Sequence, residues 1–188
     1  MNLLMAGNEN YGLAKSIKQL FPNTVSLSRS SGYNFNKVDT RHIVAEMSLN
    51  FDIFLLVSAL GDFNQTQLLK EIVFKWQEKN HKGYIIAIGS SADTPVKGTS
   101  WIYPVEKKAL RAYCRQLSQI VASESPPNWK ITYLSPGNLN TPRQEEKLPG
   151  VPKLDCEYVV KIIGWLISQP PNVNISEICL DQIQIKCA

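Results

Sequence analysis

The sequence predicts an α/β protein, a single domain over residues 1–188 with a Rossmann-like, doubly wound parallel sheet between two layers of helices. Three observations predict this class. Short, continuously apolar segments alternate along the chain with segments whose apolar residues recur at helical spacing. The 188 residues, 44% of them hydrophobic, are enough for one packed domain and too few for a second substantial one. Distinctive residues also follow several of the apolar segments, where such a sheet binds its ligands.

The first half of the chain begins with a predicted strand and a predicted helix. The apolar run over 1–6 stops at Gly7, which indicates a buried strand. Apolar residues then recur at helical spacing over 12–20, and Pro22 ends that segment. The other elements predicted in this half are a strand over 24–28, a helix over 39–49 with Asp39 or Thr40 as its N-cap and Ile43, Val44 and Met47 on its apolar face, and a strand over 52–57.

The second half of the chain continues the alternation. An amphipathic helix is predicted over 65–78, and the run Tyr84 to Ile88 that follows it is a buried strand. The remaining predicted elements are a long helix over 104–122, a strand over 129–134, a helix over 158–167 and a last strand over 175–180. The long irregular stretches, over 90–101 and 138–152, are of a length that is usually functional in a compact domain.

Composition and charge exclude several classes of protein. The formal net charge of +4 is mild, and Lys and Arg are scattered, so no basic arm for nucleic acid is expected. No segment reaches the length of a membrane span, and the first ten residues lack the basic leader of a signal peptide, so we expect a soluble, cytoplasmic protein. Four cysteines without CxxC spacing and two isolated histidines predict reduced thiols and no metal site.

Five distinctive residues lie directly after predicted strands, each after a different one. They are Gly7, Arg29, Ser58, Ser90 and Pro136. The carboxyl ends of parallel strands meet at one edge of the sheet, so five separate segments would present these residues together near the topological switch point. The pattern therefore predicts a ligand site at this edge.

The motif with the most chemistry in it is a tyrosine and lysine pair. Tyr103 and Lys107 are separated by one helical turn, so both side chains can face one cleft. Ser90 lies thirteen residues before Tyr103, at the end of a hydrophobic strand, and Ser91 is the alternative because the tandem serines leave the register open by one. After the next strand comes the run Ser135-Pro136-Gly137-Asn138-Leu139-Asn140-Thr141-Pro142.

At these residues the chain resembles the short-chain dehydrogenase/reductase family, as a short and atypical member. The resemblance rests on a strand ending in Ser, a Tyr-x-x-x-Lys pair opening a long helix, and Pro-Gly-x-x-x-Thr after the following strand. It extends over nearly the whole chain. It implies nicotinamide-dependent carbonyl or alcohol chemistry with Ser90, Tyr103 and Lys107 as the catalytic set. It also implies a fourth, asparagine member, for which Asn64 is the nearest candidate.

The chemistry that the resemblance implies is physically coherent. A free tyrosine has a pKa near 10, which is too high for an efficient proton relay at neutral pH. The Lys107 ammonium and an oxidised nicotinamide would both favour the phenolate. Tyr103 would then donate a proton to a carbonyl oxygen or accept one from an alcohol, and Ser90 would hydrogen-bond the same oxygen. Lys107 would also bind the nicotinamide ribose.

The resemblance also implies a cofactor site, with one departure in its glycine loop. In the family's Gly-x-x-x-Gly-x-Gly loop, Gly7 and Gly12 take the outer positions and Asn10 the middle one if one residue is missing. Asn10 adds a side chain at a crowded point, although asparagine tolerates positive φ better than most residues. Arg29 stands where a carboxylate would favour NAD, so NADP(H) is favoured over NAD(H). The further cofactor residues implied are Asp39 at the adenine, and Ser58, Pro136, Gly137 and Thr141 in later loops.

These inferences lead to one main hypothesis and one alternative. The main hypothesis is an NADP-dependent oxidoreductase acting on a small carbonyl or alcohol. The alternative is a non-catalytic nucleotide-binding or regulatory protein with the same fold and a degenerate cofactor loop. The resemblance further implies a homodimer or homotetramer that pairs through the helices over 65–78 and 104–122. The first of these carries more apolar residues than one face requires, and Trp76→Glu is expected to break the dimer.

Overall fold

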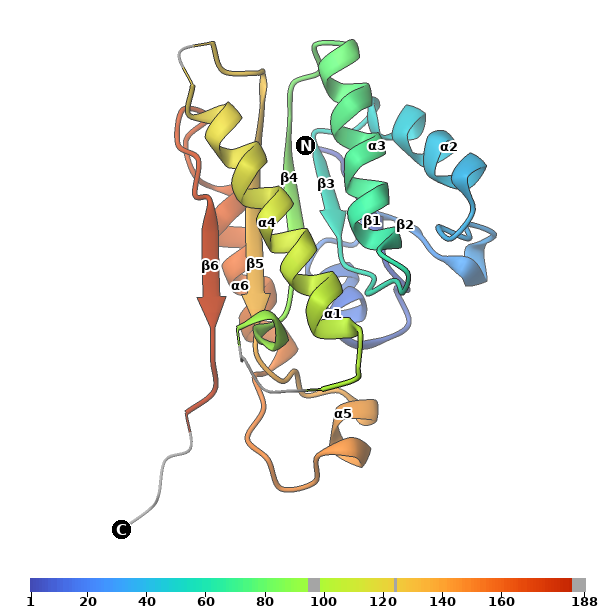
Figure 1. The fold of residues 1–188 in the computed structure, drawn as a ribbon, viewed down its shortest axis with the longest axis vertical. Coiled ribbons are helices and arrows are strands. Elements are labelled where there is room, and N and C mark those ends of the chain that lie inside the picture. Colours follow the sequence, from blue (N-terminus) through green and yellow to red (C-terminus); the bar gives the residue numbers. More distant parts are fainter. Residues whose placement is uncertain (95–98, 124, 184–188) are drawn as a thin grey trace.

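The computed structural model describes residues 1–94, 99–123 and 125–183, and it contains one sheet of six parallel strands (Figure 1). The strands are β1 (Leu3–Ala6), β2 (Val25–Leu27), β3 (Ile53–Leu56), β4 (Gly83–Ile88), β5 (Trp129–Pro136) and β6 (Glu177–Leu180), in the order β2-β1-β3-β4-β5-β6. Every neighbouring pair runs parallel. The chain leaves β1 for β2 on one side and returns to β3 on the other, so the topological switch point lies between β1 and β3.

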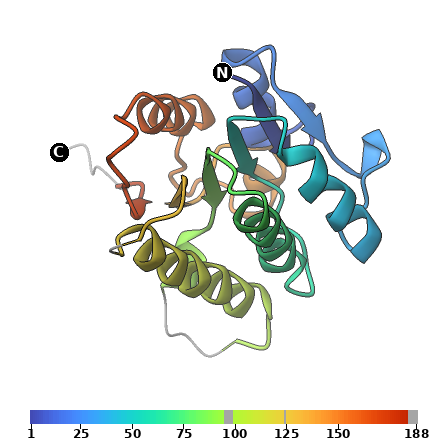
Figure 2. The same ribbon diagram turned by 90° about the horizontal axis from the view of Figure 1, so that it is seen from above.

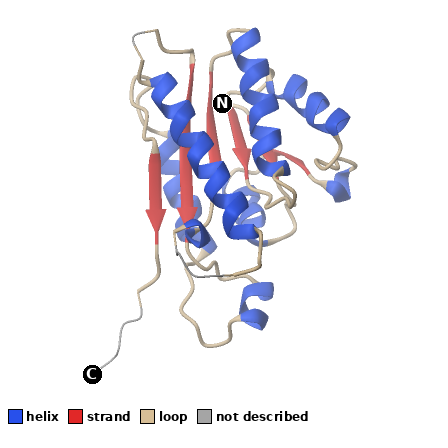
Figure 3. Cartoon of the chain, viewed as in Figure 1, coloured by secondary structure: helices blue, strands red, loops and turns tan. Residues whose placement is uncertain are grey.

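Two layers of helices cover the sheet, one on each face (Figures 1, 2 and 3). The α-helices are α1 (Gly12–Leu20), α2 (Val38–Ser48), α3 (Asn64–Glu78), α4 (Tyr103–Val121), α5 (Pro142–Lys147) and α6 (Cys156–Ile167), and the 3₁₀ turns are η1 (Arg29–Ser31) and η2 (Ser91–Asp93). One hydrophobic cluster joins the sheet to α2, α3 and α4, and a second joins the opposite face to α1 and α6. The predicted doubly wound α/β class is confirmed.

Alternate residues of each central strand pack into opposite hydrophobic clusters, so these strands contain few polar residues. In β3, Phe54 packs into the α2–α4 cluster, whereas Leu55 packs into the α1–α6 cluster. All four residues of β1 and of β3 are buried, as expected for strands covered on both faces. The edge strand β6 is only partly buried.

Helix α2 corrects two details of the prediction. It begins at Val38, one residue early, and neither Asp39 nor Thr40 is its N-cap, because Lys37 takes that position without a side-chain hydrogen bond. Its buried face is formed by Arg41, Val44, Ala45 and Ser48, whereas Ile43 is 54% exposed. The apolar residues of this segment fit more than one helical phase, and packing against α3 selects the phase that buries Val44 and Ala45.

Helix α3 corrects the expected dimer surface. Its apolar side chains Leu68, Leu69, Ile72, Val73 and Trp76 are all buried within the chain, because α2 covers the side of α3 that the sheet does not. The Trp76 indole N–H donates to Ser48 Oγ at 2.8 Å. The expectation for Trp76→Glu was therefore wrong: the charge would enter the core rather than a subunit interface.

Two properties of the described part of the chain bear on function. None of its helices is both long enough and apolar enough to cross a bilayer. Within residues 1–94, 99–123 and 125–183, no group of three or more His, Cys, Asp or Glu side chains is arranged to hold a metal ion.

Candidate active site

The loops that follow β1, β3, β4 and β5 gather at the carboxyl edge of the sheet, at the lower end of the molecule in Figure 1. Strand β4 ends at Ile88, and the chain then passes Gly89 and Ser90 before the turn η2. Gly89 is required, because a Cβ at this position would overlap the ring of Tyr133 on β5. Ser90 is the N-cap of η2, and its Oγ accepts a hydrogen bond from the Ala92 N–H at 3.2 Å. The close passage over Tyr133 thus directs the chain into the turn that carries Ser90.

Tyr103 and Lys107 lie on the first two turns of α4 and face each other. Proline at position 104 suits the start of this helix, since its φ is already helical and it lacks an N–H. The Lys107 Nζ lies 5.4 Å from the centre of the Tyr103 ring, and Trp101 stacks on that ring at 4.8 Å and 17°. Burial raises the pKa of Tyr103, and a side-chain hydrogen bond with Ser90 acts in the opposite direction. The structure thus brings Ser90, Tyr103 and Lys107 together.

Lys107 is buried, with only 3% of its surface exposed. Its ammonium donates to the Gln65 Oε1 at 2.6 Å and to the Ile88 carbonyl at 3.3 Å. Burial lowers the pKa of Lys107 to about 8, and the charges of Asp93 and Glu106 oppose that shift. A lysine whose proton is labile near neutral pH, held beside a tyrosine, is a group that can take part in proton transfer.

The structure does not bring Asn64 to this cluster. The Asn64 Oδ1 accepts from the Arg41 guanidinium at 2.8 Å, and its Nδ2 donates to the Gly61 carbonyl at 2.9 Å. The next residue, Gln65, takes the place beside Lys107, and its Nε2 also donates to the Ile88 carbonyl at 2.9 Å. One residue along a helix is a rotation of about 100°, which separates the two side chains. Sequence reasoning missed Gln65, although it was the first residue of the predicted helix.

The loop after β1 suits the pyrophosphate of a dinucleotide. Gly7 is tightly surrounded, since a Cβ there would lie 3.1 Å from Ala14 and 3.2 Å from Val57. Gly12 has φ +52°, a value that residues with a side chain rarely adopt. The N-terminus of α1 has no side-chain cap and no acidic residue in its first turn, so its N–H groups and positive dipole end remain available to an anion. Asn10 is exposed, and its N–H donates to the Asn8 Oδ1 at 3.1 Å. These residues fit a dinucleotide phosphate.

The loop after β5 reaches the same place from the other end of the chain. Pro136 is buried at the end of β5, and the Gly137 N–H donates to the Leu180 carbonyl at 2.7 Å. Thr141 caps α5, and its methyl carbon would lie 3.3 Å from a Cβ at Gly12. The Tyr11 hydroxyl also accepts from the Arg143 N–H at 3.2 Å. The start of α1 and the start of α5 therefore form one continuous part of the edge.

Three further residues expected at the cofactor have different settings. Arg29 is exposed in η1, directly beyond β2. Ser58 follows β3 and is half-buried, and its N–H donates to the Ala6 carbonyl at 2.8 Å. Asp39 does not follow a strand: it lies exposed in the first turn of α2, and residues 28–52, all described, contain no strand. The premise that placed Asp39 at the adenine is therefore wrong for this chain.

The chain is similar to known proteins in sequence and in fold. No family model matches the chain. An uncharacterized oxidoreductase of Staphylococcus epidermidis is 27% identical over 103 residues, which are 54% of this chain and 44% of that protein. The match therefore spans less than half of that relative's length. An uncharacterized oxidoreductase of Staphylococcus aureus is 21% identical, over 94% of this chain and 84% of that protein.

Solved structures resemble the chain over nearly its full length. A 4-hydroxyisoleucine dehydrogenase complexed with NADH superposes with a TM-score of 0.74 at 15% identity, covering 96% of this chain and 97% of that one. A short chain dehydrogenase/reductase family protein gives 0.70 at 14%, with 95% of each chain covered. The closed form of a serine dehydrogenase complexed with NADP+ gives 0.71 at 16%, covering 97% and 94%.

These similarities show which fold the chain has. Its sheet and helix layers are those of a Rossmann-type fold, shared over the full length of each superposition. More narrowly, the fold is that of the short chain dehydrogenase/reductase structures, so the predicted resemblance is confirmed at the level of the fold.

Proposed function

We propose that this chain is a nicotinamide-dependent oxidoreductase that transfers a hydride between its cofactor and a small carbonyl or alcohol. The observation that carries the proposal is the convergence of Ser90, Tyr103 and Lys107 at the carboxyl edge of the sheet. Two segments, the turn after β4 and the first two turns of α4, place a hydroxyl, a phenol and an ammonium in one cluster. The glycine-lined loop and uncapped α1 N-terminus at the same edge suit the cofactor's phosphates.

Each of these side chains has a distinct role in the proposed reaction. The bound nicotinamide supplies or accepts the hydride. Tyr103 donates its hydroxyl proton to the substrate oxygen in reduction and accepts it back as the phenolate in oxidation. Burial raises the pKa of Tyr103, so the neighbouring Lys107 ammonium is needed to stabilise the phenolate when it forms. Ser90 hydrogen-bonds the same oxygen and orients it toward Tyr103.

The test of this function is a cofactor titration followed by a substrate panel. Quenching of tryptophan fluorescence by NADPH and NADH measures binding, and oxidation of the bound cofactor by aldehydes, ketones and keto acids measures turnover. Saturable binding with turnover supports the proposal. Binding without turnover of any substrate, in either direction, would instead support a non-catalytic nucleotide-binding protein. Absence of binding would refute both.

We also propose that the cofactor is NADP(H) rather than NAD(H). Arg29 supports this choice, since it lies just beyond β2 and the described residues give its guanidinium no carboxylate within 4.0 Å. The similar solved structures carry NADH in one case and NADP+ in another, so they support only the class of cofactor. Arg29→Ala should reduce a roughly tenfold preference for NADPH to near parity, which is the loss of about 1.4 kcal/mol. Lys15→Ala, an exposed cation on α1, is the control. Equal wild-type affinities would contradict the assignment.

The assembly and location of the protein complete the proposal. We place it in the cytoplasm as a homodimer or homotetramer. Exposed apolar side chains on α3 and α4 support pairing: Phe74, Val105 and Ile120 are exposed. Sedimentation at micromolar concentration separates these assemblies from a 21.1 kDa monomer.

A further inference from the structure

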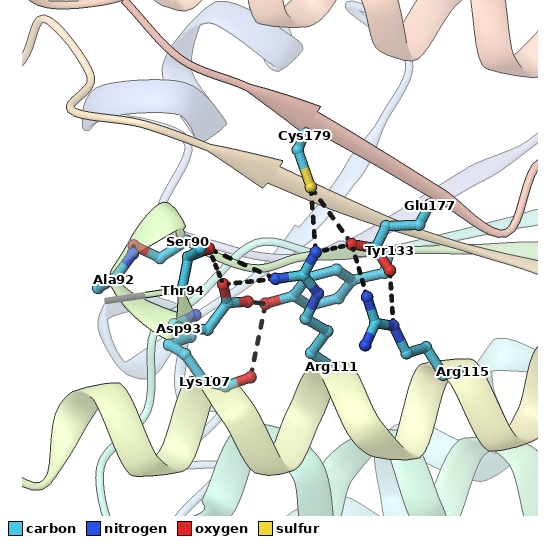
Figure 4. Close-up of polar contacts among 10 residues, drawn as sticks. All are labelled: Ser90, Ala92, Asp93, Thr94, Lys107, Arg111, Arg115, Tyr133, Glu177 and Cys179. Atoms are coloured by element: carbon cyan, nitrogen blue, oxygen red, sulfur yellow. Dashed lines mark hydrogen bonds and ion pairs between the residues drawn. The ribbon is translucent and has the colours of Figure 1, made fainter. Parts of the chain in front are cut away.

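A network of ion pairs and hydrogen bonds adjoins Ser90 and Lys107 of the proposed catalytic cluster (Figure 4). Its centre is Asp93 in η2, whose side chain is fully buried. One carboxylate oxygen accepts from the Tyr133 hydroxyl at 2.5 Å, and the other accepts from Arg111 Nη1 at 2.9 Å and from Thr94 Oγ1 at 3.0 Å. A buried carboxylate is costly unless it is paired and hydrogen-bonded, and Asp93 meets that condition through partners on β5 and α4.

The network continues from α4 to the edge strand β6. Arg111 Nη2 donates to Glu177 Oε1 and lies 3.3 Å from Cys179 Sγ. Arg115, one turn further along α4, donates through Nε to the other Glu177 oxygen at 2.8 Å. Burial would raise the pKa of Glu177, but the two arginines outweigh it and lower that pKa to about 2. The turn η2, helix α4 and strand β6 are thus joined by charged side chains (Figure 4).

The position of this network matters because it touches both halves of the catalytic cluster. Asp93 lies three residues after Ser90, and its N–H donates to the Ser90 carbonyl at 3.1 Å. The Tyr133 ring fills the space beside Gly89, and its hydroxyl lies 3.5 Å from the Lys107 carbonyl. Asp93 therefore contacts the Ser90 carbonyl through its backbone N–H, and its side chain binds Tyr133, whose hydroxyl reaches the helical turn that carries Lys107.

We infer that Asp93, Tyr133 and Arg111 are positioning residues that hold the Ser90 turn at a fixed distance from the Tyr103 and Lys107 side chains. This inference rests on the proposed function. None of the three side chains needs to touch substrate or cofactor for this role. A displacement of about 1 Å between reacting groups can lower a rate about 100-fold, so a rigid connection of this kind has a direct effect on turnover.

The electrostatic effect of Asp93 gives the inference a second, independent signature. Its charge raises the pKa of both Lys107 and Tyr103. The other groups that raise the pKa of Lys107 are Glu106 and Cys114, both on α4, and neither belongs to the network. Replacing Asp93 by Asn should therefore move the alkaline limb of kcat to lower pH, whereas Tyr133→Phe, which keeps the Asp93 charge, should lower kcat and leave that limb in place.

The experiment compares Tyr133→Phe and Asp93→Asn with Arg115→Ala in the full chain. Tyr133→Phe removes one hydroxyl and keeps the ring that packs beside Gly89, so it preserves the core. We expect kcat to fall at least tenfold in Tyr133→Phe and in Asp93→Asn, with the Kd for cofactor within threefold of wild type. Arg115→Ala is the matched control, because Arg115 binds the same Glu177 but does not contact Asp93. Its kcat should stay within twofold of wild type.

Each outcome of this experiment has one reading. If Tyr133→Phe and Asp93→Asn keep kcat within twofold of wild type and bind cofactor normally, the positioning role is refuted and the proposed function stands. If Arg115→Ala lowers kcat as much as they do, the network is only a general stabiliser of α4 against β6, which also refutes the inference. If the wild-type protein neither binds cofactor nor turns over substrate, the proposed function itself has failed. Hydrogen exchange of the 89–94 amides, faster in Tyr133→Phe than in Arg115→Ala, would report the loosened turn directly.

Discussion

The two halves of the proposed ligand-binding edge are built in different ways. The half formed by β1, α1 and β2 is shaped by backbone: glycines at 7 and 12, free N–H groups of α1 and exposed side chains such as Asn10. The half formed by β4, α4, β5 and β6 is shaped by buried side chains that hydrogen-bond one another, with Lys107 and Asp93 at its centre. The first half leaves backbone N–H groups free, whereas in the second half the buried donors of Lys107, Arg111 and Tyr133 bind other groups of the protein.

The largest effect is expected when the phenol hydroxyl of Tyr103 is removed from the proposed catalytic half. Tyr103→Phe removes the proton donor and keeps the ring that stacks on Trp101. We expect kcat to fall at least 100-fold, because general acid–base catalysis contributes about 10² to 10⁴. Cofactor affinity should stay within threefold, since the nucleotide half is unchanged. Steady-state kinetics and fluorescence titration measure the two, and a variant that keeps more than a tenth of wild-type kcat would contradict the assignment.

The next effect separates two adjacent residues at the start of α3. Gln65→Leu leaves the buried Lys107 ammonium with only the Ile88 carbonyl, so kcat should fall about tenfold or more and stability by about 1–3 kcal/mol. Asn64→Ala removes one of the two acceptors of the buried Arg41 guanidinium and should cost similar stability with kcat within threefold. Urea unfolding and kinetics on both variants measure the split. Equal loss of kcat in both would show that α3 acts only as a scaffold.

A smaller effect tests the nucleotide half with two glycines. Gly12 and Gly32 both have positive φ, +52° and +92°, so alanine at either should cost about 1 kcal/mol of stability. Only Gly12 lies against Thr141 at the start of α5, whereas Gly32 has open space around it. Gly12→Ala should therefore weaken cofactor binding several-fold, and Gly32→Ala should not. Matched thermal shifts with unequal affinities are the expected result, and equal affinities would place the cofactor elsewhere.

The last expected effect is a pH dependence of stability. Burial lowers the pKa of Lys107 to about 8, below its ordinary value of 10.5. Between these values the unfolded chain binds more protons than the folded one, so this group makes the folded state more stable as pH rises through that window. Relative to Lys107→Met, the wild-type protein should gain about 1–2 kcal/mol between pH 8 and pH 10. Urea denaturation at pH 7, 8.5 and 10 measures it. A wild-type protein that loses stability relative to the variant over this range would reverse the sign and contradict the burial argument.

The sequence predicted β1 and β3 closely because each is a continuous apolar run, as expected for a strand covered by helices on both faces. Helix α5 escaped prediction for the opposite reason: Pro142–Lys147 is short and has no buried residue, so no apolar periodicity marks it. Its one signal was Thr141, a good N-cap directly before a proline. Trp76 was misplaced because a helix with two apolar faces does not say whether its second face meets a neighbouring helix or a partner chain.

Some residues of the candidate site could likewise be predicted from the sequence, and others could not. The proximity of Ser90, Tyr103 and Lys107 could be predicted because one strand end and one helical turn determine where they lie, and their catalytic roles stay a prediction. Gln65 was missed by a single residue of helical phase, which only the packing of α3 decides. The Asp93, Arg111 and Glu177 contacts join positions 18 and 66 residues apart, and no local pattern relates such positions. Long-range polar pairs of this kind are visible only once the sheet order is known.

The passage of Gly89 across the Tyr133 ring has a consequence for how this sequence can change over evolutionary time. A side chain at 89 cannot be accommodated until 133 carries a smaller residue, because the two would share the same space. Shrinking residue 133, however, removes the hydroxyl that donates to the Asp93 carboxylate and leaves that carboxylate with Arg111 and Thr94. Substitutions at positions 89, 93 and 133 are therefore coupled. The three positions should vary together among descendants of this chain, with few viable intermediates.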